Sequence, residues 1–490
     1  MRLSQFFGLS GTQGTFDFID VYVDKDVALF IDPSAIATIN SDWADECTAT
    51  VQSFFQRVLH EVSAGHKTAA LDLLGHLSEE NATHLGYSQS SKGSGIGAGL
   101  AKKFYDELSS SAAVTTGLIS DLEETALLVP GIEEDRISDV TTNILRKQLA
   151  EYTVDVANYY GIPLHSGVAL NGPEWDLTTT SWKTKTYNLP MGPQGPLLLV
   201  PKSIARRKLF LNAGDYYTWH VLEHLKQLEY NNPQSPFMVI LKSGTPKVRK
   251  TALSDSLKSA AKAATGNKAV IKHINAATTA QAPDILSRYR ALQDQRTVRA
   301  PTSAEVATAT DTAEVDLDNL LAEVLAVPTG KPTATDYERA AEALLSALFY
   351  PELLNPIRQF RMHDGRKIID ITFTNAGDPK RFFGWLGAHH PAGHVFVECK
   401  NYAGDVKNPE FDQLAGRFSP SRGKYGLLVC RTITDKSKTI QSCRDTAQDQ
   451  RGFMTPLDDD DLKVLVEESK SQGSVSELGG LLHKRFLGLI

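Results

Sequence analysis

Apolar and polar residues alternate with the period of a β-strand in two segments near the C-terminus. The segment RKIIDITF spans residues 366–373 and places Ile368, Asp370 and Thr372 on one face. The opposite face is entirely apolar and consists of Ile369, Ile371 and Phe373. We therefore predict a strand that carries Asp370 on its polar face.

The second segment, VFVECKNY, spans residues 395–402 and repeats this pattern. Glu398 and Lys400 are predicted to point to the same side as Phe396. The other side of the strand carries Val395, Val397 and Cys399. Both strands thus bring charged side chains to one place in an otherwise apolar sheet.

Helical spacing of apolar residues surrounds these strands. The segment 336–354 carries one apolar stripe and leaves Glu338 at its edge. A second helix is predicted from Asn408, and its Gln413 and Arg417, four residues apart, share a face away from the apolar side. The C-terminal order is helix, strand, hairpin-like insertion, strand, helix, strand, helix, short strand and helix, which is typical of an α/β domain.

The N-terminal part of the chain mixes strand-like and helical patterns without an internal repeat. FDFIDVYVDKDVALFIDP predicts two strands around a turn at 24–26. Helical spacing covers 43–74 and 140–160, and Ser138 or Asp139 is the expected cap of the second segment. We expect an α/β region whose fold the sequence does not assign.

The composition changes between residues 299 and 336, where Ala, Thr, Pro and acidic residues dominate around one short predicted helix, 317–325. With 490 residues, the chain is too long for one ordinary hydrophobic core. We divide it into an N-terminal sensing, regulatory or oligomerisation region (1–298), an Ala/Thr/Pro-rich connector (299–335) and a C-terminal domain (336–490).

Composition excludes several classes of protein. A hydrophobic fraction of 41% and a charged fraction of 22% are those of a globular protein that is neither disordered nor embedded in a membrane. The sequence contains no targeting segment, and no run approaches the ~20 apolar residues of a membrane span. We therefore expect a cytoplasmic protein without membrane partners. The four cysteines are too few and too irregularly spaced for a disulfide framework or a structural zinc site.

Charge is distributed unevenly along the chain. The net charge is -7, which argues against a protein that coats nucleic acid along its whole length. Residues 356–451 nevertheless contain 16 Lys and Arg against 10 Asp and Glu, an excess of +6 that leaves -13 for the rest. An anionic substrate is therefore expected at the C-terminal domain, and the acidic N-terminal region is not expected to be the main contact for DNA.

Asp370, Glu398 and Lys400 form the candidate chemical site. Two carboxylates on adjacent strands are costly to desolvate unless a cation pairs them, and a divalent cation does so. Mg²⁺ takes oxygen ligands, here the two carboxylates and the Cys399 carbonyl, and it polarises a phosphate and lowers the pKa of a bound water. Lys400 is then placed to orient that water and to stabilise the charge of the transition state.

The spacing D-x(27)-E-x-K on two strands resembles the core of the PD-(D/E)XK nucleases, and the surrounding sequence resembles their Mrr-like restriction branch. The resemblance covers roughly residues 336–465. It implies that Glu338, which follows Tyr337, and Gln413, on the downstream helix, belong to the catalytic set. The residue before Asp370 is Ile369 instead of Pro, so the literal motif is incomplete.

The resemblance implies a restriction-endonuclease-like core, a mixed central sheet flanked by helices, and a Mg²⁺-dependent DNA endonuclease in which Mn²⁺ substitutes. It also implies defence against phage or other foreign DNA. Cleavage of both DNA strands requires two such sites, so a homodimer or higher homo-oligomer is expected. Arg417, Arg422 and Lys424 are predicted to contact DNA phosphates, because their sequence positions suggest a place beside the site.

Two alternatives stay open. The C-terminal domain is either catalytic or a silent DNA- or protein-binding module, in which case the N-terminal region does the work. Metal-assisted hydrolysis needs no 2′-hydroxyl, so the substrate is either DNA or RNA. The trigger of activity, such as a phage-derived molecule or a nucleotide, is not identified.

Gly93 and Gly95 have dinucleotide-fingerprint spacing, but no buried strand precedes them, and we expect a loop.

Overall fold

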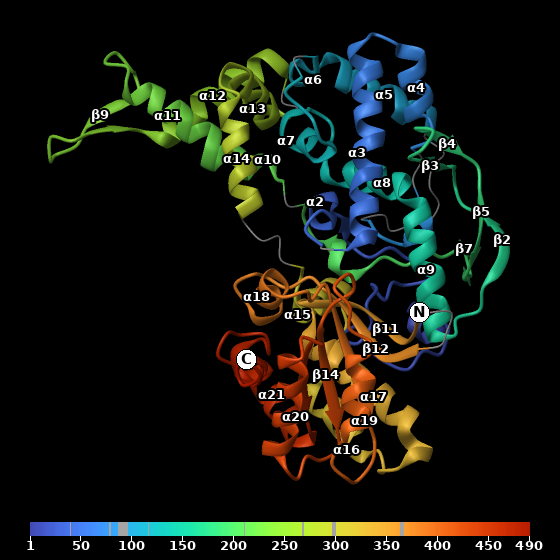
Figure 1. The fold of residues 1–490 in the computed structure, drawn as a ribbon. Helices are drawn as coiled ribbons and strands as arrows, with labels where there is room; N and C mark the ends of the chain where they lie inside the picture. Colours follow the sequence, from blue (N-terminus) through green and yellow to red (C-terminus); the bar gives the residue numbers. More distant parts are fainter. Residues whose placement is uncertain are drawn as a thin grey trace.

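The structure, a computed structural model, describes residues 1–39, 41–77, 80–86, 97–115, 117–209, 211–266, 269–295, 300–362 and 367–490. The predicted loop with Gly93 and Gly95 lies outside these ranges. Within them, every helix is too short or too polar to span a lipid bilayer. The chain forms a larger, mainly helical N-terminal part and a C-terminal α/β domain beside it (Figure 1).

The C-terminal domain contains a mixed sheet, which in the described part of the chain has five strands in the order β11-β12-β13-β14-β15. β11, β12 and β13 pair antiparallel, whereas β13, β14 and β15 pair parallel. The bounds are β11 (Leu353–Met362), β12 (Lys367–Asn375), β13 (His394–Lys400), β14 (Tyr425–Cys430) and β15 (Phe453–Leu457). The predicted α/β class with a mixed central sheet is confirmed.

Helices cover both faces of this sheet. On one face, apolar residues of α17, α18, α21 and α22 pack against Val395, Val397 and Tyr425. On the other, α19 and α20 pack against Phe396 and Leu428. The bounds are α17 (Ala334–Phe349), α18 (Phe382–His389), α19 (Asn408–Ala415), α20 (Lys436–Gln448), α21 (Asp459–Gln472) and α22 (Leu481–Leu487).

The alternation of β12 changes at Asp370. Ile371 and Phe373 lie in the apolar cluster under α17, as predicted, but Ile369 packs with Phe396 in the cluster under α19. The ladder between β12 and β13 runs from Thr374 to Ile371 and ends there. The prediction that Ile369 shares a face with Ile371 and Phe373 is therefore wrong, and the change falls where the pairing of β12 with β13 ends.

Two further elements differ from the predicted order. β11 was not expected, because its sequence contains Pro356 and two arginines, and its pairing with β12 is interrupted by a bulge between Leu354 and Ile357. The hairpin-like insertion between β12 and β13 is instead built around helix α18. Its apolar residues Phe382, Phe383 and Leu386 are fully buried, so core packing decides its conformation.

The N-terminal part contains many short elements. Its helices are α1 (Leu3–Phe6), α2 (Pro33–Ile36), α3 (Asp42–Ser63), α4 (Lys67–Leu74), α5 (Gly97–Ser110), α6 (Ala112–Thr115), α7 (Thr125–Leu128), α8 (Glu134–Ile144), α9 (Arg146–Tyr160), α10 (Ala213–Tyr216), α11 (Leu222–Tyr230), α12 (Lys250–Thr265), α13 (Val270–Gln281) and α14 (Asp284–Gln295). Its strands are β1 (Phe30–Ile31), β2 (His165–Ala169), β3 (Glu174–Asp176), β4 (Ser181–Lys183), β5 (Thr186–Leu189), β6 (Met191–Gly192), β7 (Gly195–Pro196), β8 (Ala205–Arg206), β9 (Met238–Ile240) and β10 (Pro246–Val248). The described strands pair only in two-stranded ladders.

The sequence predicted the long helices of this part better than its strands. The expected helical segments appear as α3 with α4 and as α8 with α9, and α9 ends at Gly161, whose φ of +71° suits a glycine. α8 begins at Glu134, so the expected cap at Ser138 or Asp139 is wrong. The expected hairpin around 24–26 is also wrong, because residues 16–31 pair as isolated bridges and as β1 with distant segments.

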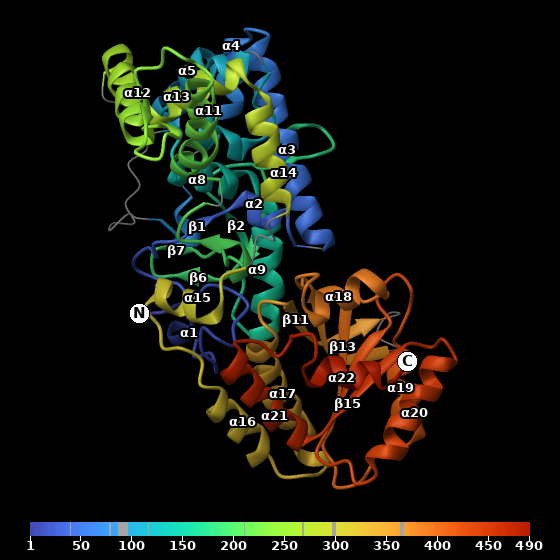
Figure 2. The ribbon, with the colours of Figure 1, turned by 90° about the vertical axis from the view of Figure 1, so that its left-hand side faces the viewer.

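The connector is divided between the two parts of the chain. It contains α15 (Ser303–Thr310) and α16 (Leu317–Ala326), of which only the second was predicted. Val306 of α15 is buried in the N-terminal core, and the side chain of Arg2 donates to the carbonyl of Asp311 at 2.9 Å. α16 packs on α17 and α21 of the C-terminal domain (Figure 2). The segment therefore ties both parts together.

A buried polar cluster joins the two parts directly. The backbone N–H of Asn355, in the bulge of β11, donates to Asp17 at 3.2 Å. The ammonium of Lys202 lies 3.9 Å from the ring centre of Tyr350, and Leu354 packs in the N-terminal core. The edge strand β11 is thus held by the N-terminal part.

Candidate active site

The candidate site forms where β12 departs from β13. The last pair of these strands is Ile371 with Val397, so one further step along the antiparallel register brings Asp370 level with Glu398. The backbone N–H of Cys399 donates to Asp370 at 2.8 Å. A carboxylate therefore replaces the regular backbone partner at this point, and the two acidic side chains approach one another.

Lys400 and Gln413 complete the polar group around Glu398. The Lys400 ammonium lies 2.7 Å from Glu398 Oε1, and it also donates to the Gln413 side chain at 3.4 Å. The Gln413 amide donates to the same Glu398 oxygen. Gln413 projects from α19, whose Phe411 and Leu414 are buried against the sheet, so core packing of this helix sets the direction of its side chain.

Burial dominates the electrostatics of the site. Glu398 is completely buried, and this burial together with the neighbouring Asp370 raises the pKa of Glu398 to about 7. Burial also raises the pKa of Asp370, although the Cys399 N–H, Lys400 and Arg417 oppose the shift. Burial lowers the pKa of Lys400, but Glu398 and Asp370 outweigh it, so the net pKa is raised. The site thus holds two carboxylates for one close ammonium.

The donor set fits a hard divalent cation. Glu398 Oε2 is buried without a hydrogen-bond partner among the described residues, which leaves one oxygen available to a ligand. Asp370 adds a second carboxylate, and Mg²⁺ is commonly held by one or two carboxylates with water in its remaining positions. No three His, Cys, Asp or Glu side chains surround a common point in the described ranges. The ligand role of the Cys399 carbonyl stays a prediction.

Glu338 and Asn401 lie at the margin of the site. Glu338, on the first turns of α17, is half-buried and is close enough to contribute to the raised pKa of the buried Cys399 thiol, after burial itself and Asp370. Asn401 was not singled out from the sequence. Its side-chain amide donates to the carbonyls of Pro328 and Gly330 at 3.0 and 3.2 Å, in the loop before α17. Asn401 therefore fixes the helix that carries Glu338.

The three predicted phosphate contacts separate into two groups. Arg417 is near the carboxylates, because its charge opposes the raised pKa of Asp370 and of Glu398. Arg422 and Lys424 lie at the other end of the sheet, where the backbone carbonyl of Arg422 accepts from the His394 N–H at 3.1 Å. Six strand residues of about 3.3 Å each separate Lys424 from the Lys400 end, which is roughly 20 Å. The prediction that Arg422 and Lys424 lie beside the site is wrong.

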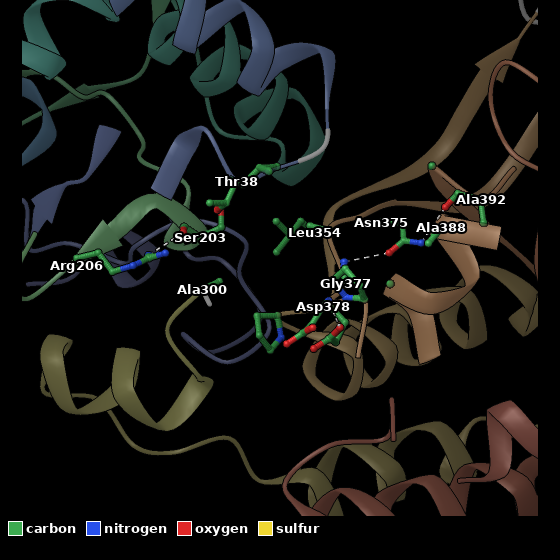
Figure 3. A pocket seen from close by; sticks show the side chains of 18 residues that line it. Thr38, Ser203, Arg206, Ala300, Leu354, Asn375, Gly377, Asp378, Ala388 and Ala392 are labelled. Atoms are coloured by element: carbon green, nitrogen blue, oxygen red, sulfur yellow. Dashed lines mark hydrogen bonds between the residues drawn. The ribbon is translucent and has the colours of Figure 1, made fainter. Parts of the chain in front are cut away.

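A cavity of about 350 Å³ lies at this other end, between the two parts of the chain (Figure 3). Arg206, Ser203 and Thr38 line it from the N-terminal part, and Asn375 and Asp378 from the C-terminal domain. Much of its remaining wall consists of small residues of the loop after β12 and of α18. None of the residues that line this cavity belongs to the candidate active site.

Comparison with known proteins covers only the N-terminal part. Residues 8–212 match the model of a family that is described as a domain of unknown function, DUF8370. No curated protein and no solved structure matches the chain. The matched range ends well before the C-terminal domain and contains none of the residues of the candidate active site.

Proposed function

We propose that this protein is a Mg²⁺-dependent DNA endonuclease whose active site consists of Asp370, Glu398 and Lys400. The observation that carries the proposal is the convergence of these side chains at one break in the sheet, with one buried oxygen of Glu398 left without a partner. The resemblance of residues 336–465 to the PD-(D/E)XK nucleases supports the same reading. Defence against phage or other foreign DNA is the biological role that this resemblance suggests.

Each residue has a distinct part in this proposal. Asp370 and Glu398 would hold the cation, which when bound polarises the scissile phosphate and acidifies water. Lys400, held at 2.7 Å from Glu398, orients the attacking water and offsets the negative charge that develops on the phosphate. Gln413 restrains Glu398 and Lys400 together. Arg417 binds a phosphate of the substrate next to the scissile bond.

The substrate is proposed to be DNA because residues 356–451 carry a positive excess and because the resembling nucleases act on DNA. One such site cuts one strand, so cleavage of both strands needs a second copy. We therefore propose a homodimer or higher homo-oligomer as the active form. An RNA nuclease remains the second candidate, since the same chemistry needs no 2′-hydroxyl.

The test is cleavage of supercoiled plasmid by the full-length protein during titration with Mg²⁺, and separately with Mn²⁺. We expect nicked and linear products in both metals and none in EDTA. Lys400→Ala should cut about 10²- to 10³-fold more slowly, because it removes a charge that stabilises the transition state. Lys463→Ala is the matched control, since Lys463 is an exposed lysine of the same domain that pairs with Asp460.

Two results would remove the assignment. Undiminished cutting by pure Lys400→Ala protein would show that another site or a contaminant cleaves the plasmid. DNA binding without any cleavage in either metal would favour a silent binding module. RNA and DNA of equal sequence, compared side by side, separate the two nuclease candidates.

A further inference from the structure

Strands β9 and β10 form a hairpin that stands away from the body of the N-terminal part, on helices α11 and α12 (Figure 1). We call residues 222–265, which comprise these four elements, the arm. The two strands pair only with each other in the described part of the chain. The turn is closed by the Leu241 N–H, which donates to the Thr245 carbonyl at 2.9 Å. The result is an isolated two-stranded ribbon.

The ribbon is anchored at its base and open at its tip. Val248, at the base, is 1% exposed and packs in the N-terminal core, with Met238 opposite it on β9. Ile240, at the far end of β9, is 75% exposed. Lys242 and Lys247 are exposed on either side of the turn. The tip is therefore presented to solvent by a base that belongs to the folded core.

The arm carries the opposite charge to the chain as a whole. Residues 222–265 contain seven Lys and Arg and three Asp and Glu, an excess of +4 in a chain whose net charge is -7. In the described ranges, no acidic side chain forms an ion pair with Lys242, Lys247 or Arg249. At the base, Glu223 already pairs with Lys226 and Lys250. Positive charge without an acidic partner among the described residues therefore lies on the ribbon and at Arg249, which follows it.

We infer that the arm is a second DNA-binding surface, which binds duplex DNA through the ribbon. A two-stranded β-ribbon is narrow enough to enter the major groove, and lysines on both of its edges can then reach the phosphates that flank the groove. The hydroxyls of Ser243 and Thr245 at the turn are further phosphate partners. The choice of DNA as the ligand rests on the proposed function, but binding by the arm does not require cleavage.

This surface would add a DNA contact to an N-terminal region that the sequence does not predict to be the main contact for DNA. The charge of -13 outside residues 356–451 is a sum over the whole region, in which the local positive charge of the arm cannot be seen. Because the arm is built on the N-terminal part and not on the C-terminal sheet, its contact is separate from that of Arg417. It provides affinity without taking part in the chemistry.

The test measures binding of the full-length protein to a short fluorescent duplex in EDTA, across a series of NaCl concentrations. The arm variant is Lys242→Gln/Lys247→Gln. The control is Lys102→Gln/Lys103→Gln, which removes the same charge from two exposed lysines of α5. We expect the arm variant to bind about tenfold more weakly. The slope of log Kobs against log[NaCl] should be smaller in magnitude by about 2, because each lost phosphate contact reduces the slope by about 0.9.

Equal affinity and equal salt dependence of the arm and control variants would overturn the inference, as would a wild-type protein that does not bind the duplex. A lower mass of the arm variant in light scattering, with unchanged DNA affinity, would overturn it in favour of a contact between copies. Absence of cleavage with Mg²⁺ refutes the proposed nuclease but leaves this binding result intact. Thermal melting confirms that both variants are folded.

Discussion

The two parts of the molecule each bury a carboxylate–lysine cluster, and the clusters differ in how completely they are paired. In the N-terminal part, Asp17 accepts from the Tyr152 hydroxyl at 3.1 Å and from the Asn355 N–H at 3.2 Å. In the C-terminal domain, Glu398 keeps one buried oxygen without a partner, and Asp370 adds a second carboxylate beside it.

The balance of charge separates the clusters further. Lys202 donates to the Gly14 carbonyl at 3.3 Å and faces one carboxylate, Asp17. Burial raises the pKa of Asp17 as well as the pKa values of Asp370 and Glu398. The difference is that Lys400, with Arg417 nearby, faces two carboxylates and one oxygen of Glu398 has no partner among the described residues. A set in which every group has a partner holds a structure together, whereas a surplus of buried negative charge needs a further cation. Four substitutions test this distinction, from the largest expected effect to the smallest.

Asp370→Ala should abolish cleavage, with a loss on the order of 10³-fold, because it removes a proposed metal ligand. Its stability in EDTA should be unchanged or higher, since Asp370 raises the pKa of Glu398 and the two carboxylates repel each other. Plasmid cleavage and thermal melting measure both effects. Asp460→Ala, at an exposed aspartate of the same domain, is the control. A stability loss without a change in cleavage would contradict the distinction.

Asp17→Ala should lower the stability of the protein and leave its cleavage activity nearly unchanged. It leaves the Tyr152 hydroxyl, the Asn355 N–H and the buried Lys202 without their acceptor or counter-charge, so the free energy of unfolding should fall by about 3 kcal/mol. Cleavage per folded molecule should change less than twofold. Denaturant titration gives the first quantity and an active-fraction assay the second. Asp24→Ala, at an exposed carboxylate, is the control and should cost little.

Glu398→Gln should change the pH dependence of stability in EDTA. The pKa of Glu398 is raised from 4.5 to about 7, so its contribution to stability is complete below pH 4.5 and is lost as the pH rises through 7. Relative to Glu398→Gln, the wild-type protein should lose about 3 kcal/mol between these limits. Denaturant titrations at a series of pH values test this. Parallel pH profiles of the two proteins would refute it.

Gln413→Ala should have the smallest effect, a roughly tenfold decrease in kcat with little change in KM. Gln413 acts by holding Glu398 and Lys400, and removal of such a supporting contact commonly costs 10- to 100-fold, of which we expect about the lower figure. Asp412→Ala, at the exposed neighbour on the same helix, is the control. A rise in KM with unchanged kcat would indicate substrate binding instead of positioning.

The sequence predicted those features of the C-terminal domain that follow from local patterns. β13 and α17 follow regular periods, and β12 does so from Ile371 onward, so the sequence predicted these elements and the approach of Asp370, Glu398 and Lys400. The placement of Arg422 and Lys424 was not, because nearness in sequence does not reveal which end of a parallel strand a loop occupies. β11 was missed because a bulge and a proline disguise its period.

The N-terminal part was less predictable because its contacts are distant in sequence. Phe18 bridges to Pro201, Val27 bridges to Leu85, and Asp17 accepts from Asn355. No periodic pattern links such positions. The sequence of the arm contained a usable signal, the run of lysines around a Ser-Gly-Thr turn, but averaging charge over the whole region concealed it.

The packing of the N-terminal part against β11 also protects the molecule from misassembly. β11 is the outer strand of its sheet, and such strands offer unpaired N–H and carbonyl groups to any other chain in an extended conformation. Leu354, packed in the N-terminal core, and Arg358, whose guanidinium lies 5.2 Å from the ring centre of Tyr159, shield this edge. A fragment that begins at residue 336 would expose it, and aggregation is the expected fate of that fragment.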